Sequence, residues 1–252
     1  MPRSIRLWGL VRASLIMVAA LGALSYVDVS VRQRDGGRLS AVIFDPLYAD
    51  DPGLHAEMAN LLAAHGYTVD SVTGEKATPG ALMRLGHRDV MVLRVHSTCN
   101  LGEVWFFTGE EYSQDRYVLE QIADEVHKAR PSLGSRHVFA VGSSFVRRFM
   151  AGSLRGTIVL LMGCDRLRSE DLATAFTECG AAAYMSWDGP VSLPDTDWAF
   201  LGLLETLAAQ SMTLGDAVAH ANGLVGQDPD YNSTLRLKPD ESARVGAGRG
   251  AG

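Results

Sequence analysis

Short apolar runs alternate with segments of helical spacing along most of this chain, and this alternation restricts the fold more than any other feature. The runs Ala41–Phe44, Val90–Val95 and Thr157–Met162 are apolar at almost every position, which is typical of strands buried on both faces. Strands and helices that alternate at short intervals predict a parallel sheet covered on both sides. We therefore expect an α/β fold, a three-layer α/β/α sandwich with a mostly parallel, doubly wound sheet.

The expected elements lie between residues 41 and 224. The strands are predicted at 41–44, 67–72, 90–95, 157–162 and 182–187, with a minor strand at 137–141. The helices are predicted at 54–65, 78–85, 117–129, 169–179, 196–210 and 214–224. Ser169 is interpreted as the N-cap of its helix, and Gly66 and Gly180 as residues that end helices. The aromatic and acidic stretch 105–111 is interpreted as a hairpin over the site or a packing insert.

The N-terminus has the pattern of an export segment. Arg3, Arg6 and Arg12 precede an uncharged run from Ala13 to Val27, as in secretory signals. The run is shorter than the roughly 20 residues of a full membrane span, but it can just cross a bilayer if Arg12 snorkels. The alternatives are an uncleaved signal anchor, a signal peptide cleaved near residues 23–25, and a cytosolic helix. Arginines before the span favour an extracytoplasmic domain, either membrane-anchored or secreted.

The remaining chain is expected to form one domain. Residues 1–28 are assigned to the signal anchor or signal peptide, and the polar residues 29–38 to a linker. Residues 39–240 form the predicted α/β domain, a length that suits a single core. Residues 241–252 end in a glycine-rich low-complexity sequence and are expected to be a disordered tail.

Charge and cysteine content exclude some classes of protein. The formal net charge is −6, and because the first 27 residues hold three arginines and no acid, the rest is more acidic still. A body this acidic repels phosphate backbones, so we expect no nucleic-acid partner. The three cysteines, Cys99, Cys164 and Cys179, are too few for a disulfide framework.

Two residues at predicted strand ends form a chemical pair. His96 follows the strand 90–95, and Cys164 follows Gly163 after the strand 157–162. Parallel strands end at one edge of a sheet, about 4.8 Å from their neighbours, so these side chains can meet there. A cysteine nucleophile needs a nearby base, and backbone N–H groups at Ser97 and Gly163 are the natural donors to an oxyanion. We therefore predict His96 and Cys164 as catalytic residues, with Ser97 and Gly163 forming the oxyanion hole.

These residues also carry a family resemblance. The sequences Val-Leu-Arg-Val-His96-Ser97 and Ile-Val-Leu-Leu-Met-Gly163-Cys164 resemble the strand ends of cysteine peptidases of the caspase, legumain and gingipain fold, to which CHAT domains and separases are related. The segments Asp171-Leu-Ala-Thr-Ala-Phe, Gly180-Ala-Ala-Ala-Tyr and Ser186-Trp187 resemble the gingipain and CHAT branch. The resemblance extends over residues 40–224. It implies a caspase-like fold and a His/Cys dyad that cleaves peptide or protein substrates without a cofactor. Ser97 departs from the glycine that commonly follows the family histidine.

Further candidates lie near the predicted dyad. Trp187 and Asp188 follow the strand 182–187 and are predicted to bind substrate, with Asp188 selecting a basic side chain. The alternatives are a turn in which Asp188 caps its own backbone and a Trp187 that plugs the sheet edge. Cys99 is a rival thiol or the partner of Cys164 or Cys179 in a disulfide. His96-x-x-Cys99 has no second half-site, so we expect no metal.

Three functions are compatible with this pattern. The leading hypothesis is a membrane-tethered, extracytoplasmic cysteine endopeptidase that acts by acyl transfer. The alternative is a catalytically inactive caspase-like module that binds or senses a partner, which Ser97 and the acidic surface favour. A receiver-like domain that uses Asp45 is a third reading, but the sequence lacks the additional acidic pair and the lysine of that class. Nothing in the sequence defines an oligomeric state.

Overall fold

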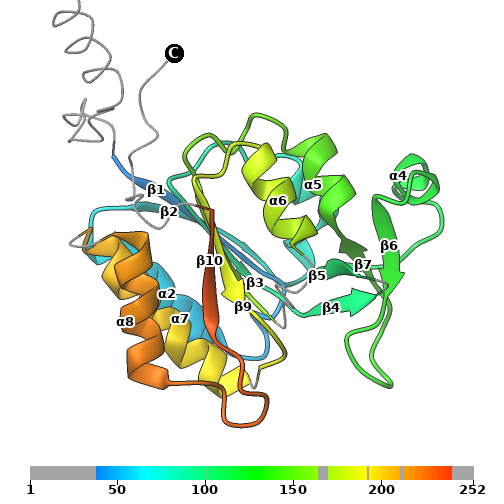
Figure 1. Cartoon of the computed structure of the whole chain (residues 1–252). Helices are drawn as coiled ribbons and strands as arrows, with labels where there is room; N and C mark the ends of the chain where they lie inside the picture. Colours follow the sequence, from blue (N-terminus) through cyan, green and yellow to red (C-terminus); the bar gives the residue numbers. More distant parts are fainter. Residues whose placement is uncertain (1–37, 101, 164–169, 192, 211–212, 240–252) are drawn as a thin grey trace, which may run out of the picture. The chain divides into compact units, whose positions relative to one another are not determined.

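The computed structural model describes residues 38–239 except residues 101, 164–169, 192 and 211–212, and these residues belong to one compact unit, Asp35–Gly252. The main sheet has the strand order β10-β9-β8-β3-β1-β2 (Figure 1). Its strands are β1 (Ser40–Asp45), β2 (Thr68–Thr73), β3 (Val90–Arg94), β8 (Ile158–Met162), β9 (Ala183–Trp187) and β10 (Leu235–Pro239). All are parallel except β10, which pairs antiparallel with β9. The predicted mixed α/β fold with a mostly parallel sheet is confirmed.

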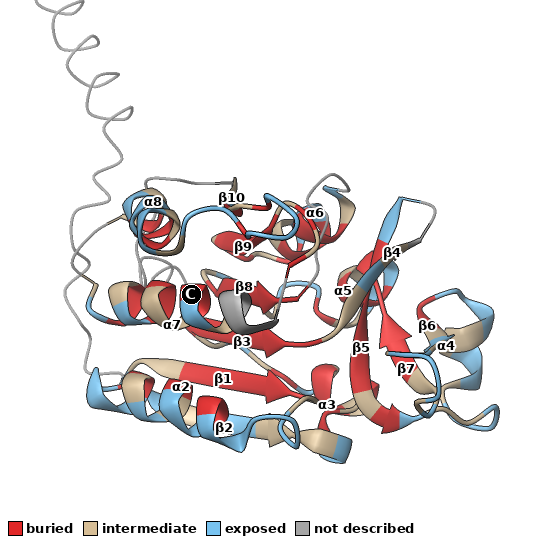
Figure 2. Ribbon diagram, turned by 90° about the horizontal axis from the view of Figure 1, so that it is seen from below, coloured by how far each residue is buried: buried red, intermediate tan, exposed pale blue. Residues whose placement is uncertain are grey.

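Helices cover both faces of this sheet. One face packs against α2 (Pro52–Ala64), α7 (Leu193–Ala208) and α8 (Leu214–Val225). The other face packs against α3 (Pro79–Leu82), α5 (Ser143–Phe149) and α6 (Asp171–Glu178). Figure 2 shows that β3 is buried along its length and β1 is buried after its first residue, whereas β2, at the sheet edge, is largely exposed. Burial of the central strands on two faces explains their continuous apolar sequences.

The helix α2 shows how the sequence sets these elements. Asp51 is its N-cap and accepts a hydrogen bond from the Leu54 amide, and a proline follows directly at the first helical position. Leu54, Met58 and Leu62 lie on one helical face and are buried against the sheet. Gly66 has a φ of 86°, so it adopts a conformation that glycine favours after a helix.

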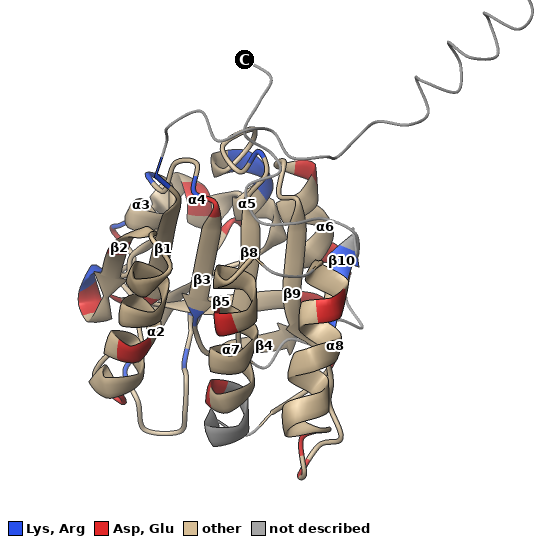
Figure 3. Cartoon of the chain, turned by 90° about the vertical axis from the view of Figure 1, so that its left-hand side faces the viewer, with Lys and Arg blue, Asp and Glu red and all other residues tan. Residues whose placement is uncertain are grey.

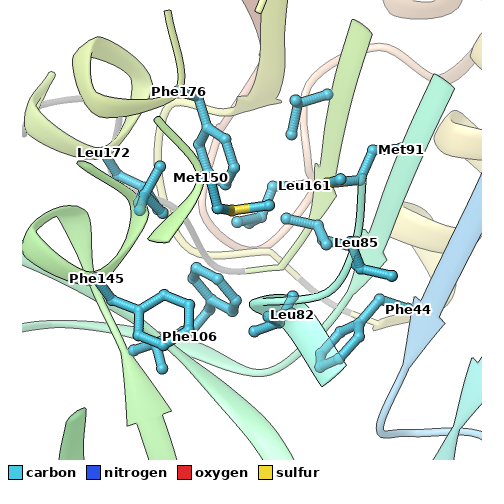
Figure 4. Packing of buried hydrophobic residues seen from close by; sticks show 14 of the residues in the cluster. Phe44, Leu82, Leu85, Met91, Phe106, Phe145, Met150, Leu161, Leu172 and Phe176 are labelled. Carbon is cyan, nitrogen blue, oxygen red and sulfur yellow. The ribbon is translucent and has the colours of Figure 1, made fainter. Parts of the chain in front are cut away.

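A second sheet was not predicted from the sequence. It has the antiparallel order β4-β5-β7-β6, formed by β4 (Ser97–Asn100), β5 (Glu103–Glu111), β7 (Val138–Val141) and β6 (Val126–Ala129). One of its faces completes the core on the α5 and α6 side of the main sheet, where Phe106 packs with Phe145 and Leu161 (Figure 4). The 3₁₀ turn η1 (Gly74–Lys76) lies so close to β5 that a Cβ on Gly109 would lie 1.9 Å from the Gly74 carbonyl oxygen. The predicted insert at 105–111 is therefore part of β5.

Several sequence predictions need correction. The helix predicted at 117–129 is wrong beyond its first turns, because α4 (Val118–Ile122) is short and β6 follows it. Positive φ values at Tyr117 and Asp124 interrupt the helical path, and pairing of β6 with β7 outweighs the local pattern. The helix predicted at 78–85 is limited to α3, and the minor strand at 137–141 belongs to the second sheet. Helix α5 and strand β10 were not predicted. The helix predicted from residue 169 is α6, which begins at Asp171, and Ser169 lies outside the described residues.

Within the described residues, no helix has the length and apolar character to cross a membrane. The N-terminal export segment, residues 1–28, and the tail, residues 241–252, both lie outside those residues. The assignments made for them therefore stay predictions.

Candidate functional site

The carboxyl ends of β3 and β8 lie side by side. The two strands are parallel neighbours with Arg94 opposite Met162, and the next amide, that of Val95, donates a hydrogen bond of 3.0 Å to the Met162 carbonyl. His96 and Gly163 therefore leave the same edge of the sheet from adjacent strands. The expectation that these strands are neighbours is confirmed. Cys164 follows Gly163 but lies outside the described residues, so its contact with His96 stays a prediction.

The environment of His96 is partly shielded from solvent. Its side chain is half-buried, and its carbonyl accepts a hydrogen bond of 2.8 Å from the Phe107 amide in the second sheet. Burial lowers the pKa of His96, the Asp50 carboxylate partly opposes this, and the Arg94 guanidinium lowers it again. At neutral pH the ring is therefore uncharged, which is the form that can accept a proton from a thiol.

Gly163 and Ser97 approach each other closely at this edge. A Cβ on Gly163 would lie 2.6 Å from the Val95 carbonyl oxygen and 2.9 Å from the Ser97 hydroxyl oxygen, so only glycine fits. The hydroxyl oxygen of Ser97 is buried and has no hydrogen-bond partner. Close packing gives Gly163 a steric role in addition to the predicted oxyanion role. Both residues flank the strand ends where an oxyanion is expected, and their donor roles stay predictions.

Trp187 and Asp188 do not present free groups at this edge. Trp187 is 0% exposed and packs in the core beneath α7, which matches the sequence alternative of a residue that plugs the sheet. The Asp188 carboxylate accepts hydrogen bonds from the Thr234 amide and hydroxyl, at 2.8 and 2.9 Å, and from Arg236 at 2.9 Å. Burial alone would raise the pKa of Asp188, but these hydrogen bonds outweigh it and lower the pKa. The geometry thus assigns Asp188 to fixing Thr234 and the first residues of β10, and a substrate-binding role gains no support.

A groove of about 1320 Å³ lies between α8 and β10. Its lining includes Asp188, Asn222 and Arg236 but neither His96 nor Gly163. The groove is therefore separate from the predicted site residues His96 and Gly163. Asp188 and Arg236 form an ion pair with each other, so these two charged groups of the groove are already partnered.

A buried charged cluster, missed in the sequence, lies beside the predicted site. Asp45, the last residue of β1, is 0% exposed, and its carboxylate accepts a hydrogen bond of 3.3 Å from Arg94. Arg94 also donates to the Leu47 carbonyl at 3.1 Å, and its Nε lies 3.8 Å from the Asp197 carboxylate on α7. Burial raises the pKa of Asp197 to about 6, although Arg94 opposes the shift. The sequence signal was Arg94 itself, a charged residue within an apolar strand, two positions before His96.

Cys99 and Cys179 bear on the predicted alternatives of a disulfide and a metal site. Cys99 and Cys179 are free thiols, so the disulfide considered between them is not formed. Cys179 is buried and donates to the Val146 carbonyl at 3.3 Å, and burial together with Glu178 raises the pKa of its thiol. No group of three or more histidine, cysteine, aspartate or glutamate side chains within the described ranges could hold a metal ion.

Comparisons with known proteins add no family assignment. No protein-family model matches the chain, and no curated protein matches its sequence.

Proposed function

We propose that this protein is a caspase-like cysteine endopeptidase in which Cys164 is the nucleophile and His96 the proton acceptor. The supporting observation is the pairing of β3 with β8, which brings the residue before Cys164 to the sheet edge that His96 leaves. A second point is the topology. The strand order reverses between β1 and β3, and ligands of doubly wound sheets bind outside the strand ends at such a reversal. His96 follows the strand on one side of it.

The proposed reaction is acyl transfer. The neutral imidazole of His96 takes the thiol proton, and the resulting thiolate attacks the peptide carbonyl carbon. Backbone N–H groups at Ser97 and Gly163 stabilise the oxyanion. His96 then returns the proton to the leaving amine as the C–N bond breaks, and a thioester remains on Cys164. Water hydrolyses the thioester and releases the acid. No metal or cofactor takes part in this scheme.

We further propose that the domain is extracytoplasmic and tethered to the membrane by its N-terminal segment, or secreted if that segment is cleaved. A nucleic-acid partner is not part of the proposal. The face formed by α2, α7 and α8 carries acidic side chains and no lysine or arginine on these helices (Figure 3). An acidic face of this kind repels a phosphate backbone and is compatible with a protein or peptide substrate.

A thiol-directed peptide probe tests the assignment. The full chain should form a covalent adduct with peptidyl acyloxymethyl ketones, located by mass spectrometry at Cys164. Replacing Cys164 with Ala should abolish the adduct, and His96→Ala should slow it by about 100-fold or more, as expected for loss of a general base. Cys99→Ser is the matched control, because Cys99 is a free thiol three residues after His96, and this variant should label normally. Undiminished labelling of the Cys164→Ala variant would refute the proposal.

The second candidate is an inactive binding module of the same fold. It is favoured by one observation, the Ser97 side chain packed against Gly163 where the related peptidases commonly have glycine. This reading predicts that no peptide probe reacts with Cys164, and that a protein partner captured by the full chain is retained equally by the Cys164→Ala variant.

A further inference from the structure

A second cluster of reactive side chains shares Asp45 with the buried charged cluster and extends from the end of β1 to β2. Its members are Ser71 on β2, His55 on α2 and Asp45 at the end of β1. The Nδ1 atom of His55 lies 2.9 Å from the Asp45 carboxylate, and its Nε2 atom lies 3.0 Å from the Ser71 hydroxyl oxygen. The three side chains thus form a continuous hydrogen-bonded series of carboxylate, imidazole and hydroxyl.

The direction of these hydrogen bonds follows from chemistry. A carboxylate only accepts, so the neutral-ring tautomer that fits these contacts has its N–H at Nδ1, which donates a hydrogen bond to Asp45. Nε2 is then unprotonated and accepts from Ser71, whose hydroxyl must donate. This is the tautomer in which an imidazole removes a proton from a serine nucleophile. Arg94 donates to the other oxygen of Asp45, which fixes the carboxylate from its far side.

Burial in this series decreases from the carboxylate to the hydroxyl. Asp45 is 0% exposed and His55 is 7% exposed, with Tyr48 packed edge-on against the ring. Ser71, in contrast, is exposed, because β2 is the edge strand of the main sheet (Figure 2). The nucleophile is therefore open to a reagent while the groups that would activate it are held in fixed positions.

The backbone at Ser71 supplies a donor to a reacting carbonyl. The Thr68 amide donates to the Leu39 carbonyl, at the start of β1, at 2.8 Å. Because successive amides of a strand point to opposite sides, the Ser71 amide points away from β1, toward the unpaired edge. An oxyanion formed beside the Ser71 hydroxyl can accept a hydrogen bond from this N–H, as serine hydrolases use the amide of their own nucleophile.

We propose that Ser71 and His55, with Asp45 behind them, form a nucleophilic serine site that reacts with small carboxylic esters. The Ser71 oxygen forms a bond to the acyl carbon, His55 takes the hydroxyl proton, and the ester C–O bond breaks as His55 returns that proton to the leaving alcohol. Water then attacks the acyl-serine through His55 and releases the acid. An open edge strand suits a small acyl group. This site does not depend on the proposed role of Cys164.

A fluorophosphonate probe tests the site on the full chain. The Ser71 oxygen should displace fluoride and become phosphonylated, with the adduct located by mass spectrometry. Ser71→Ala should remove the adduct and His55→Gln should slow it by about 100-fold or more. Thr73→Ala, two residues along the same strand, is the matched control and should label normally. Because Ser71 is exposed, water can replace its hydroxyl at His55, so the Ser71→Ala variant should remain folded, as circular dichroism can check.

Three results would overturn the proposal. One is a folded protein with no Ser71 adduct. Another is labelling at Ser71 no faster than at the exposed loop residue Ser132. The last is a His55→Gln variant that is folded and labels at the parental rate. The Cys164→Ala variant should keep the Ser71 adduct, so failure of the cysteine site and failure of the serine site are separate outcomes.

Discussion

Replacing Asp197 with Asn should stabilise the protein at neutral pH. Burial raises the pKa of Asp197 from 3.8 to about 6, and Asp51 and Asp45 add to the shift, so the charged form is unfavourable despite Arg94. The folded state binds this proton more tightly than the unfolded chain. The stabilisation that the protonated Asp197 side chain gives the folded state is therefore fully present below about pH 3.8 and is lost as the pH rises through about 6.

The size of the effect follows from the same shift. A difference of about 2.2 pKa units corresponds to about 3 kcal/mol at 1.36 kcal/mol per unit, which is a ceiling. The side chain is 21% exposed, so solvent screening reduces this to roughly 1.5 kcal/mol. Asparagine is neutral at every pH. Its advantage over aspartate should thus be about 1.5 kcal/mol at pH 7.5 and about half of that at pH 5.

Urea denaturation at pH 7.5 and pH 5 measures the two free energies of unfolding. Glu205→Gln, an exposed neutralisation on the same helix, is the matched control and should change the free energy by less than about 0.5 kcal/mol at either pH. A variant less stable than the parent at pH 7.5 would contradict the reasoning, because the ion pair with Arg94 would then outweigh burial.

Three further outcomes are expected. Gly163→Ala should lower the free energy of unfolding by about 1–3 kcal/mol and slow labelling of Cys164, because the added methyl group would collide with the Val95 carbonyl oxygen. An unchanged free energy of unfolding together with an unchanged labelling rate would contradict the steric argument. Asp50→Asn should lower the pKa of His96 further, so the acid limb of the pH profile for Cys164 labelling should move to lower pH, and a shift to higher pH would reverse the assigned sign. Asn222→Ala should lower the melting temperature by several degrees, because the Asn222 amide group bonds both the N–H and the C=O of Leu235 on the outer side of β10. Size-exclusion chromatography should also show self-association through the opened edge of the sheet. A monomer of unchanged stability would argue against this edge-capping role.

The main sheet and most of its helices were predictable because their signals are local. A strand buried on two faces must be apolar at successive positions, as at 158–162, and a helix packed on one side must repeat its apolar residues, as α2 does. The placement of His96 and Gly163 at one edge followed from the parallel arrangement alone. The second sheet was not predictable, since its strand β6 has no apolar alternation of its own and is fixed by pairing with β7.

The candidate site likewise has features that the sequence predicted and features that only the structure showed. The sequence by itself determined which residues follow the strands, and so predicted that His96, Gly163 and Cys164 form one group, of which the structure describes His96 and Gly163. Only the tertiary structure decided that Trp187 is enclosed, that the Asp188 carboxylate is bound by the chain before β10, and that Asp45 joins His55 to Arg94. The physical reason is the distance along the chain over which each property is determined. Periodicity, and the order of elements along the chain, are set by residues close in sequence, whereas strand pairing, burial and hydrogen-bond partners depend on segments that are far apart in the chain and meet only in the folded protein.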